Sequence, residues 1–329
     1  MRKGLVTPPR ERISLTPILR AGAYGAFGLI ILAFALAAPS FLSFGNLANV
    51  LQQSAILGLL AFGLTIVIIG GGGNVIRGGI DLSLAANLGL SAAIYATLIK
   101  NGHSDLIAVV ATLAGGLAVG ALNALAVVGL HIVPLLATLA VAKIVNGLEF
   151  VLTQNSVVTA SSPFLTWLSD VGPFGVPIMA YALVLATLIV VPAVQSTPAG
   201  LRLHAIGAHP EAARAAGLSL AVYIAGSYIL SGALGALAGV LSAAYLTGSS
   251  PGSADILLSV VVAALLGVVF SRRLVPTIGG TLLSVLFIGL LANGFQLVNI
   301  SSYWINGVQG FLILFVVACT TIGRQGATA

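Results

Sequence analysis

Charged residues are scarce in this chain. Asp, Glu, Lys and Arg make up 6% of its 329 residues, whereas about 25% is usual in a soluble domain. Hydrophobic residues account for 59%. So few charges cannot cover the surface of a protein that folds in water, and the composition therefore excludes a soluble globular protein.

Cysteine, metal-binding motifs and nucleotide-binding motifs are also missing. Cys319 is the one cysteine, which excludes an intrachain disulfide framework and cysteine-rich zinc or iron–sulfur sites. The four histidines are scattered and form no His-Glu-x-x-His motif. None of the three lysines follows a glycine, as a P-loop would require. We therefore expect no metal, no cofactor and no P-loop ATP site in this chain, and we expect it not to be an enzyme.

The basic excess does not indicate a nucleic-acid partner. Thirteen Lys and Arg oppose seven Asp and Glu, which gives a net charge of +6. A nucleic-acid-binding protein gathers its basic residues on one solvated face beside a normal core. This sequence has no such face, so we interpret the excess as a signal of membrane orientation.

Long hydrophobic stretches dominate the sequence. Residues 21–76, for example, are 56 residues without a charge. A membrane-spanning helix needs about 20 mostly apolar residues, and these continuous runs lack the alternation of a β-barrel. We predict an all-α integral membrane protein with about ten transmembrane helices. The predicted spans lie near 21–38, 47–69, 80–98, 105–129, 134–154, 177–194, 219–247, 255–270, 277–298 and 304–322.

The distribution of Lys and Arg orients this bundle, because positively charged loops stay in the cytoplasm. With the N-terminus inside, eleven of the thirteen basic residues fall on the cytoplasmic side, Lys100 falls outside and Lys143 lies within a span. The chain begins like a signal peptide, but cleavage would place the later arginines on the wrong side, so we expect an uncleaved first span. Both termini are then cytoplasmic.

Small residues recur on two predicted spans. Ser231, Gly235, Gly239 and Ala243 follow one another at intervals of four, and Gly116 and Gly120 do the same. Helices in lipid associate through close approach of small residues, since lipid gives them no hydrophobic reason to pair. We expect these faces to be helix contacts.

The predicted cytoplasmic loop 195–218 contains a short helix. Pro210 and Glu211 suit its first turn, and Gly217 suits its C-terminal cap. Glu211 and Arg214 are three residues apart, a spacing that permits an ion pair on a solvated connector. The alternative, which we favour, is a docking element for a cytoplasmic partner.

Three separated motifs resemble one family of transporters. Glu-Ala-Ala-x-x-x-Gly at 211–217 resembles the coupling loop of ABC-transporter permeases. Gly-Gly-Ile-Asp-Leu-Ser at 78–83 resembles the signature of ABC permeases of the ribose/xylose/arabinose type. Segments at 279–281, 292–294 and 302–304 are similar to the same family. The resemblance covers about residues 45–320.

The resemblance implies that transport is shared among several different subunits. The chain would be a permease in the inner membrane of a bacterium, paired with a second copy of itself or with a sister permease. Cytoplasmic ABC ATPase subunits would hold ATP and Mg²⁺ and dock on the coupling loop, and a periplasmic binding protein would deliver the solute. The residues expected to couple permease and ATPase are Gly207, His209, Glu211, Ala212, Ala213, Arg214 and Gly217.

The implied domain organisation is a permease domain between two short tails. Residues 1–20 form a cytoplasmic N-terminal tail and residues 324–329 a cytoplasmic C-terminal tail. The permease domain, 21–323, carries the cytoplasmic loop 195–218 and a periplasmic segment at 155–176. The expected solute is a monosaccharide or a related polyol. The alternatives are a branched-chain amino-acid or nucleoside importer of related layout, or an ion-coupled secondary transporter.

Polar residues within the spans are the candidates for the translocation pathway. A charge in the middle of a bilayer costs about 2.5 to 3.5 kcal/mol on insertion scales, so Lys143 and Glu149 should face protein or water. Asp81 either caps the third span or belongs to a gate segment. Amides could bind sugar hydroxyls or join helices, and we expect about half of Gln52, Gln53, Asn87, Asn123, Asn293, Gln296 and Gln309 to face the pathway. The candidate pathway residues are Asp81, Ser83, Asn87, Lys143, Asn146, Glu149, Asn293 and Gln296.

Overall fold

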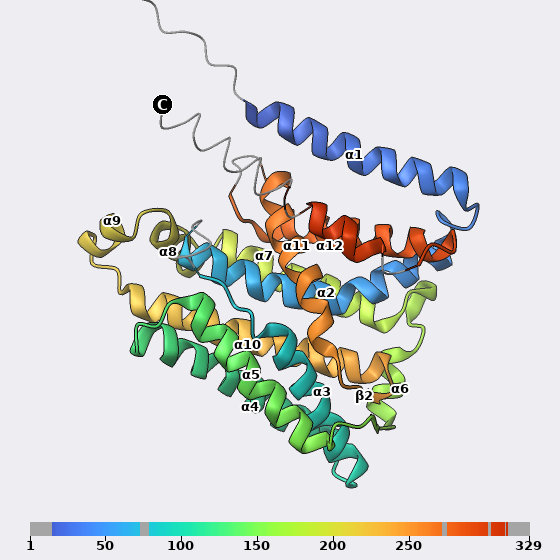
Figure 1. Ribbon diagram of the computed structural model, residues 1–329, viewed down its shortest axis with the longest axis horizontal. Coiled ribbons are helices and arrows are strands. Elements are labelled where there is room, and N and C mark those ends of the chain that lie inside the picture. Colours follow the sequence, from blue (N-terminus) through green and yellow to red (C-terminus); the bar gives the residue numbers. More distant parts are fainter. Residues whose placement is uncertain (1–14, 73–78, 272–274, 302–303, 313, 315–329) are drawn as a thin grey trace, which may run out of the picture.

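Helices make up most of the described chain (Figure 1). The computed structural model describes residues 15–72, 79–271, 275–301, 304–312 and 314. The helices are α1 (Leu15–Ala37), α2 (Phe44–Gly71), α3 (Leu84–Lys100), α4 (Asp105–Ala124), α5 (Pro134–Thr153), α6 (Pro163–Ser169), α7 (Ile178–Gln195), α8 (Pro198–Ala208), α9 (Pro210–Ala215), α10 (Leu220–Tyr245), α11 (Leu257–Phe270) and α12 (Ile278–Leu297). A π-helical turn (Leu125–Gly129) continues α4, two 3₁₀ turns lie at Pro173–Gly175 and Ser253–Ile256, and residues 304–312 are helical.

Six helices of the described chain are long and apolar enough to cross a membrane: α2, α4 with its π-helical turn, α5, α7, α10 and α12. Shorter apolar helices are the Phe27–Ala37 part of α1, together with α3 and α11. Each of the first nine predicted spans therefore coincides with an apolar helix. For the tenth, 304–322, the structure describes residues 304–312 and 314, and the rest lies outside the described residues.

Two helices begin three or four residues away from the approximate starts of the predicted spans, for identifiable reasons. The second helix begins at Phe44 rather than 47, because the hydroxyl of Ser43 accepts a hydrogen bond from the backbone N–H of Asn46 and caps the first turn. The third begins at Leu84 rather than 80, because Asp81 turns the chain locally and bonds the backbone N–H of Ser83. Asp81 therefore precedes α3 and does not cap it.

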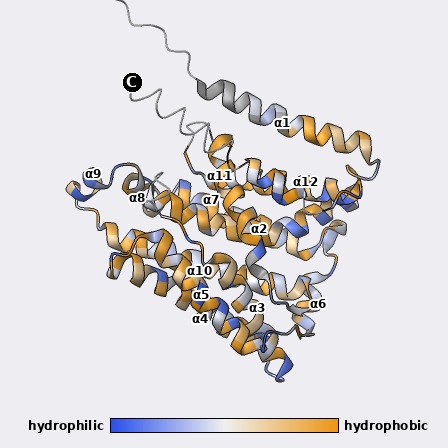
Figure 2. Cartoon of the chain, in the orientation of Figure 1, coloured by the Kyte–Doolittle hydropathy of each residue, from blue (hydrophilic) through white to orange (hydrophobic). Residues whose placement is uncertain are grey.

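The core of the bundle surrounds α2. In its most hydrophobic 18-residue window 89% of the residues are buried, against 28% for α4 and α7. Helices α7, α10, α11 and α12 pack around α2, while α4 and α5 lie beyond α10 and α1 lies at the opposite edge (Figure 1). Orange hydrophobic colour covers the long helices, whereas α9 is largely hydrophilic (Figure 2).

Close backbone approach joins α10 to α4 and α3. A side chain at Gly232 would collide with the carbonyl oxygen of Gly116, and one at Gly120 would lie 2.5 Å from the carbonyl oxygen of Tyr228. A side chain at Gly239 would likewise collide with Ser91 of α3. The expectation that these small residues form helix contacts is confirmed.

The two ends of the bundle carry different connections (Figure 1). Helices α8 and α9 lie at one end, and α6 lies at the other together with β2. There β1 (Val158–Thr159) pairs antiparallel with β2 (Gly248–Ser249), so the segments that follow α5 and α10 are held together. The coupling-loop candidate and this strand pair are thus separated by the length of the long helices.

Candidate functional site

The connection between α7 and α10 folds as two short helices. Thr197 caps α8 by accepting a hydrogen bond from the backbone N–H of Gly200 at 3.2 Å. Helix α9 begins at Pro210, and Gly217 follows it with a φ of +80°. The N–H of Gly217 bonds the carbonyl of Arg214, and that of Leu218 bonds the carbonyl of Ala213, which is the Schellman arrangement. The predicted helix, its start and its cap are confirmed.

Helix α9 presents an exposed polar face. Arg214 and Glu211 form the expected ion pair at 3.6 Å, with 67% and 86% of their side chains exposed. Ala213 is buried, whereas His209 and Ala212 are exposed. Exposed ion pairs contribute only about 0–1 kcal/mol to stability, so the fold does not depend on this one.

The inner face of α8 meets the end of α2 backbone to backbone. A side chain at Gly207 would collide with the carbonyl oxygen of Ile69, and one at Gly72 would lie 2.6 Å from the carbonyl oxygen of Gly207. One turn earlier, Leu203 of α8 fills the space that Gly70 of α2 leaves open. Beside this contact, burial lowers the pKa of His204 below its usual value, so this imidazole is neutral at pH 7.

Asp81 is the centre of a buried polar network. Its Oδ1 accepts hydrogen bonds from the backbone N–H and hydroxyl of Ser83, at 3.0 and 2.7 Å, and from Asn123 of α4 at 3.3 Å. Its Oδ2 accepts from the hydroxyl of Ser231 of α10 at 2.7 Å. Asn123 also donates to Ser83 at 2.7 Å. Asp81 is 1% exposed, so this carboxyl joins the segment before α3 to α4 and α10 inside the bundle.

Neighbouring bonds extend this network. The backbone N–H of Leu82 donates to Thr138 of α5, and the hydroxyl of Tyr228 donates to the carbonyl of Ile80. One turn into α3, Asn87 donates to the carbonyl of Gly232 at 2.9 Å. Three of the predicted pathway residues, Asp81, Ser83 and Asn87, are therefore brought together, and each is bonded to neighbouring segments.

The other candidate pathway residues are scattered. Lys143 is exposed, Asn146 is half-buried and Gln296 is exposed. Glu149 is buried against Gly89 of α3, and its Oε1 has no hydrogen-bond partner among the described residues. Asn293 forms a reciprocal amide pair with Asn46, at 2.8 and 3.0 Å, which joins the C-terminal part of α12 to the start of α2.

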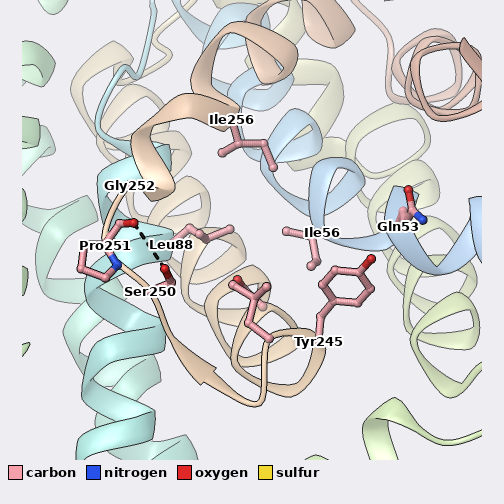
Figure 3. Close-up of a pocket in the computed structure, with 10 residues that line it drawn as sticks. Gln53, Ile56, Leu88, Tyr245, Ser250, Pro251, Gly252 and Ile256 are labelled. Carbon is pink, nitrogen blue, oxygen red and sulfur yellow. Dashed lines mark hydrogen bonds between the residues drawn. The ribbon is translucent and has the colours of Figure 1, made fainter. Parts of the chain in front are cut away.

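Two adjacent cavities open between α2 and the C-terminal helices. The first has a volume of about 400 Å³ and lies among α2, α3, α10 and the segment from Ser250 to Ile256. The second, of about 360 Å³, lies among α2, α11, α12 and the helix at 304–312. Gln53 and Ile256 line both. Figure 3 shows Ile56, Tyr245 and Gln53 on one side of the first cavity and Leu88 and Pro251 on the other.

Both cavities combine apolar side chains with uncharged polar ones, and among the described residues no charged side chain lines either. Polar side chains in the first are Gln53, Ser242, Tyr245 and Ser250; those in the second are Gln53, Ser54, Ser259, Asn306 and Gln309. Gln53 and Gln309 were among the amides that the sequence singled out, but the serines were missed. Serine is common at helix contacts, and its sequence position gives no sign of which serines face open space.

Residues 248–252 read Gly-Ser-Ser-Pro-Gly and so fit the Gly-x-Ser-x-Gly pattern of serine hydrolases. Ser250, the central serine, donates a hydrogen bond to the carbonyl of Pro251. A hydrolase serine requires a neighbouring base, and among the described residues no histidine, lysine or carboxylate lines this cavity. In this structure Ser250, Pro251 and Gly252 of the pattern form part of the cavity wall.

Comparison with known proteins identifies similar chains. The family model described as "Branched-chain amino acid transport system / permease component" matches residues 46–317. The ribose import permease protein RbsC of Bacillus subtilis is 33% identical over 312 residues, which cover 94% of this chain and 95% of that protein. The corresponding protein of Escherichia coli K12 is 30% identical over 284 residues, 85% of this chain and 86% of that protein.

A further relative is named for a different solute. The galactofuranose transporter permease protein YtfT of Escherichia coli K12 is 29% identical over 283 residues, or 81% of each chain. No solved structure matches the chain significantly. The stretch matched by the family model includes α8 and α9, the Asp81 network and the residues that line both cavities.

Proposed function

The chain belongs to the family of permease components of branched-chain amino acid transport systems, and from this premise we propose that it forms the pathway of a sugar importer. It is a multi-pass membrane permease of a bacterial ABC importer and not an enzyme, and ATP binds to a partner ATPase. The proposed solute is a monosaccharide or related polyol, delivered by a periplasmic binding protein. The pathway would be shared with a second copy of this chain or with a sister permease.

The observation that carries the sugar assignment is the uncharged lining of the cavities. A branched-chain amino acid crosses as a zwitterion, and burying its ammonium and carboxylate requires charged partners or strong dipoles. A sugar requires only hydrogen-bonding hydroxyl and amide groups, which both cavities supply. The names of the relatives, which refer to ribose and galactofuranose, favour the same solute class.

Uptake by the assembled importer tests the solute class. The permease, its ATPase and its binding protein would be placed in proteoliposomes and supplied with ATP and radiolabelled D-ribose, D-galactose or L-leucine. We expect ATP-dependent accumulation of a sugar and none of leucine. Accumulation of leucine alone would instead favour the amino-acid branch of the family, and sugar uptake under an ion gradient without nucleotide would favour a secondary transporter.

We also propose that α8 and α9 face the cytoplasm and dock on the ATPase. This orientation places both termini inside and α6 and β2 on the periplasmic side of a ten-span bundle, as the positive-inside rule predicts. Helix α9 is suited to docking because its cap fixes its direction while Glu211 and Arg214 point into solvent. The proposed coupling residues are Gly207, His209, Glu211, Ala212, Ala213, Arg214 and Gly217.

Removing the charges of α9 is expected to weaken this docking. The double variant Glu211→Ala/Arg214→Ala should lower co-purification of the ATPase and reduce ATP-driven uptake by about tenfold or more, because charged interface pairs contribute on the order of 1.5–7 kcal/mol. Arg202→Ala is the matched control, since Arg202 is exposed on α8 and bonds only Tyr223 among the described residues. Unchanged co-purification and uptake in the double variant would exclude the docking role of α9.

A further inference from the structure

The two cavities that meet at Gln53 have the properties of a binding site. Their volumes, about 400 and 360 Å³, lie within the range of roughly 300–1,000 Å³ found for small-molecule sites. Because Gln53 and Ile256 line both, the two spaces are neighbours, one on each side of these residues.

An unpaired buried hydroxyl lies in the wall of the second cavity. Ser54 is 1% exposed, and its hydroxyl has no hydrogen-bond partner among the described residues. Leaving a buried polar group without a partner is costly, so such groups in native proteins call for a ligand or water. On the facing helix α12, a side chain at Gly289 would collide with this hydroxyl. Glycine at 289 therefore leaves room for the hydroxyl of Ser54 between α2 and α12.

Further hydrogen-bonding groups surround the same space. Ser259 of α11 donates to the side-chain carbonyl of Gln309 at 3.1 Å, which leaves the amide N–H groups of Gln309 as donors. The cavity also has Asn306 and Gln53 in its wall, so donors and acceptors approach it from α2, α11 and the helix at 304–312. Apolar side chains, among them Leu57 and Ile288, fill the remaining wall. This mixture suits a small neutral solute with several hydroxyl groups.

The position along α2 places the site near one end of the bundle. Gln53 lies nine residues from the start of α2, about 14 Å along the helix, and eighteen residues from its other end, about 27 Å. The nearer end is that of α6 and β2, which the proposed orientation turns toward the periplasm. A solute that leaves the binding protein would therefore reach these cavities before it reaches α8.

We propose that the paired cavities form a solute-binding subsite within a single permease subunit, with Ser54 and Gln53 as its hydrogen-bonding groups and a neutral monosaccharide as its ligand. The inference rests on the proposed function and adds the residues that recognise the solute. Gln53 stands between the two cavities and contacts the solute as it passes from the first to the second. None of the eight pathway residues expected from the sequence lines either cavity.

Thiol labelling tests occupancy directly. Asn306→Cys, at an exposed position in the wall of the second cavity, would be introduced after Cys319→Ser has removed the native thiol, and the rate of maleimide labelling would be measured with free D-ribose, with L-leucine and with neither. The binding protein is left out, so a docked protein cannot shield the thiol. We expect D-ribose to slow labelling at least threefold and L-leucine to leave it unchanged. In the control variant Ser40→Cys, on the exposed loop before α2, neither solute should alter the rate.

A matched pair of glutamine variants tests recognition. Gln53→Leu should reduce D-ribose uptake about fivefold, the effect of one neutral hydrogen bond, and should remove the protection of Asn306→Cys by D-ribose. Gln52→Leu should change neither, because Gln52 contacts Met179 of α7 and lines neither cavity.

Different experimental outcomes would overturn the subsite and the proposed function. If the unmodified importer accumulates ribose while D-ribose does not slow labelling, the subsite is wrong and the importer assignment stands. Equal effects of the Gln53 and Gln52 variants on uptake would also overturn the subsite. If the unmodified importer accumulates no sugar at all, the proposed function itself fails.

Discussion

Gly207→Ala is expected to stop ATP-driven uptake while the partner ATPase still binds and hydrolyses ATP. The added methyl group would collide with the carbonyl oxygen of Ile69, and backbone atoms of Ile69 and Gly72 cannot move aside as a flexible side chain could. Helix α8 must then separate from the end of α2, while the exposed face of α9 is unchanged. A movement of α8 would then no longer be transmitted to α2.

This contact matters because α2 connects the two proposed working parts of the permease. Its last turn touches α8. Its first half lines the first cavity with Gln53 and Ile56, and the second with Gln53, Ser54 and Leu57. Between them α2 is a continuous helix without proline, and from Ser54 to Gly70 all but one of its residues are buried. A continuous packed helix is the kind of rigid element through which one site can influence another.

The measurement is the number of solute molecules taken up per ATP hydrolysed, with co-purification of the ATPase as a second readout. Gly226→Ala is the matched control, since a side chain there would meet nothing within 4 Å. A second pair of variants tests the same contact between α2 and α8. In Gly70→Ala the added methyl group would press on Leu203 and reduce coupling. Adding Leu203→Ala to this variant should restore coupling, because it removes the obstructing methyl groups. Normal uptake per ATP in Gly207→Ala would disprove the role of this contact.

The helices were predictable from the sequence because hydrophobic runs determine where they lie. The short helix α9 was equally accessible, since Pro210 and Gly217 are local signals for a start and a cap. The central position of α2 was not. In a membrane protein a buried helix and a lipid-facing helix are both apolar, so hydrophobic periodicity does not distinguish them.

The burial or exposure of individual polar side chains was the hardest feature to predict. Lys143 and Glu149 lie on the same helix, yet one is exposed and the other buried, and only the packing of α5 on α3 decides this. The cavities also escape sequence reasoning, because they form where four segments distant in the sequence meet. Whether the eight expected pathway residues contact solute stays a prediction.

Asp81→Ala is expected to reduce the amount of folded permease severely. The carboxylate accepts hydrogen bonds from the backbone and hydroxyl of Ser83, from Asn123 and from Ser231. Its removal leaves buried donors of three segments without their acceptor, and each orphaned group costs about 1–3 kcal/mol. Several such losses together are comparable to the stability of a typical domain, about 5–15 kcal/mol.

Asp81→Asn should be milder, because the amide oxygen still accepts from Ser83 while the hydroxyl of Ser231 can turn and accept from the amide N–H. Thermal unfolding in detergent and the monodisperse fraction in size-exclusion chromatography would rank the variants. Asp170→Ala is the control, since this exposed carboxyl accepts only from the backbone N–H of Val171 among the described residues. If Asp81→Ala unfolds at the wild-type temperature and loses only uptake, Asp81 acts in the pathway rather than as the bond that joins α4 and α10.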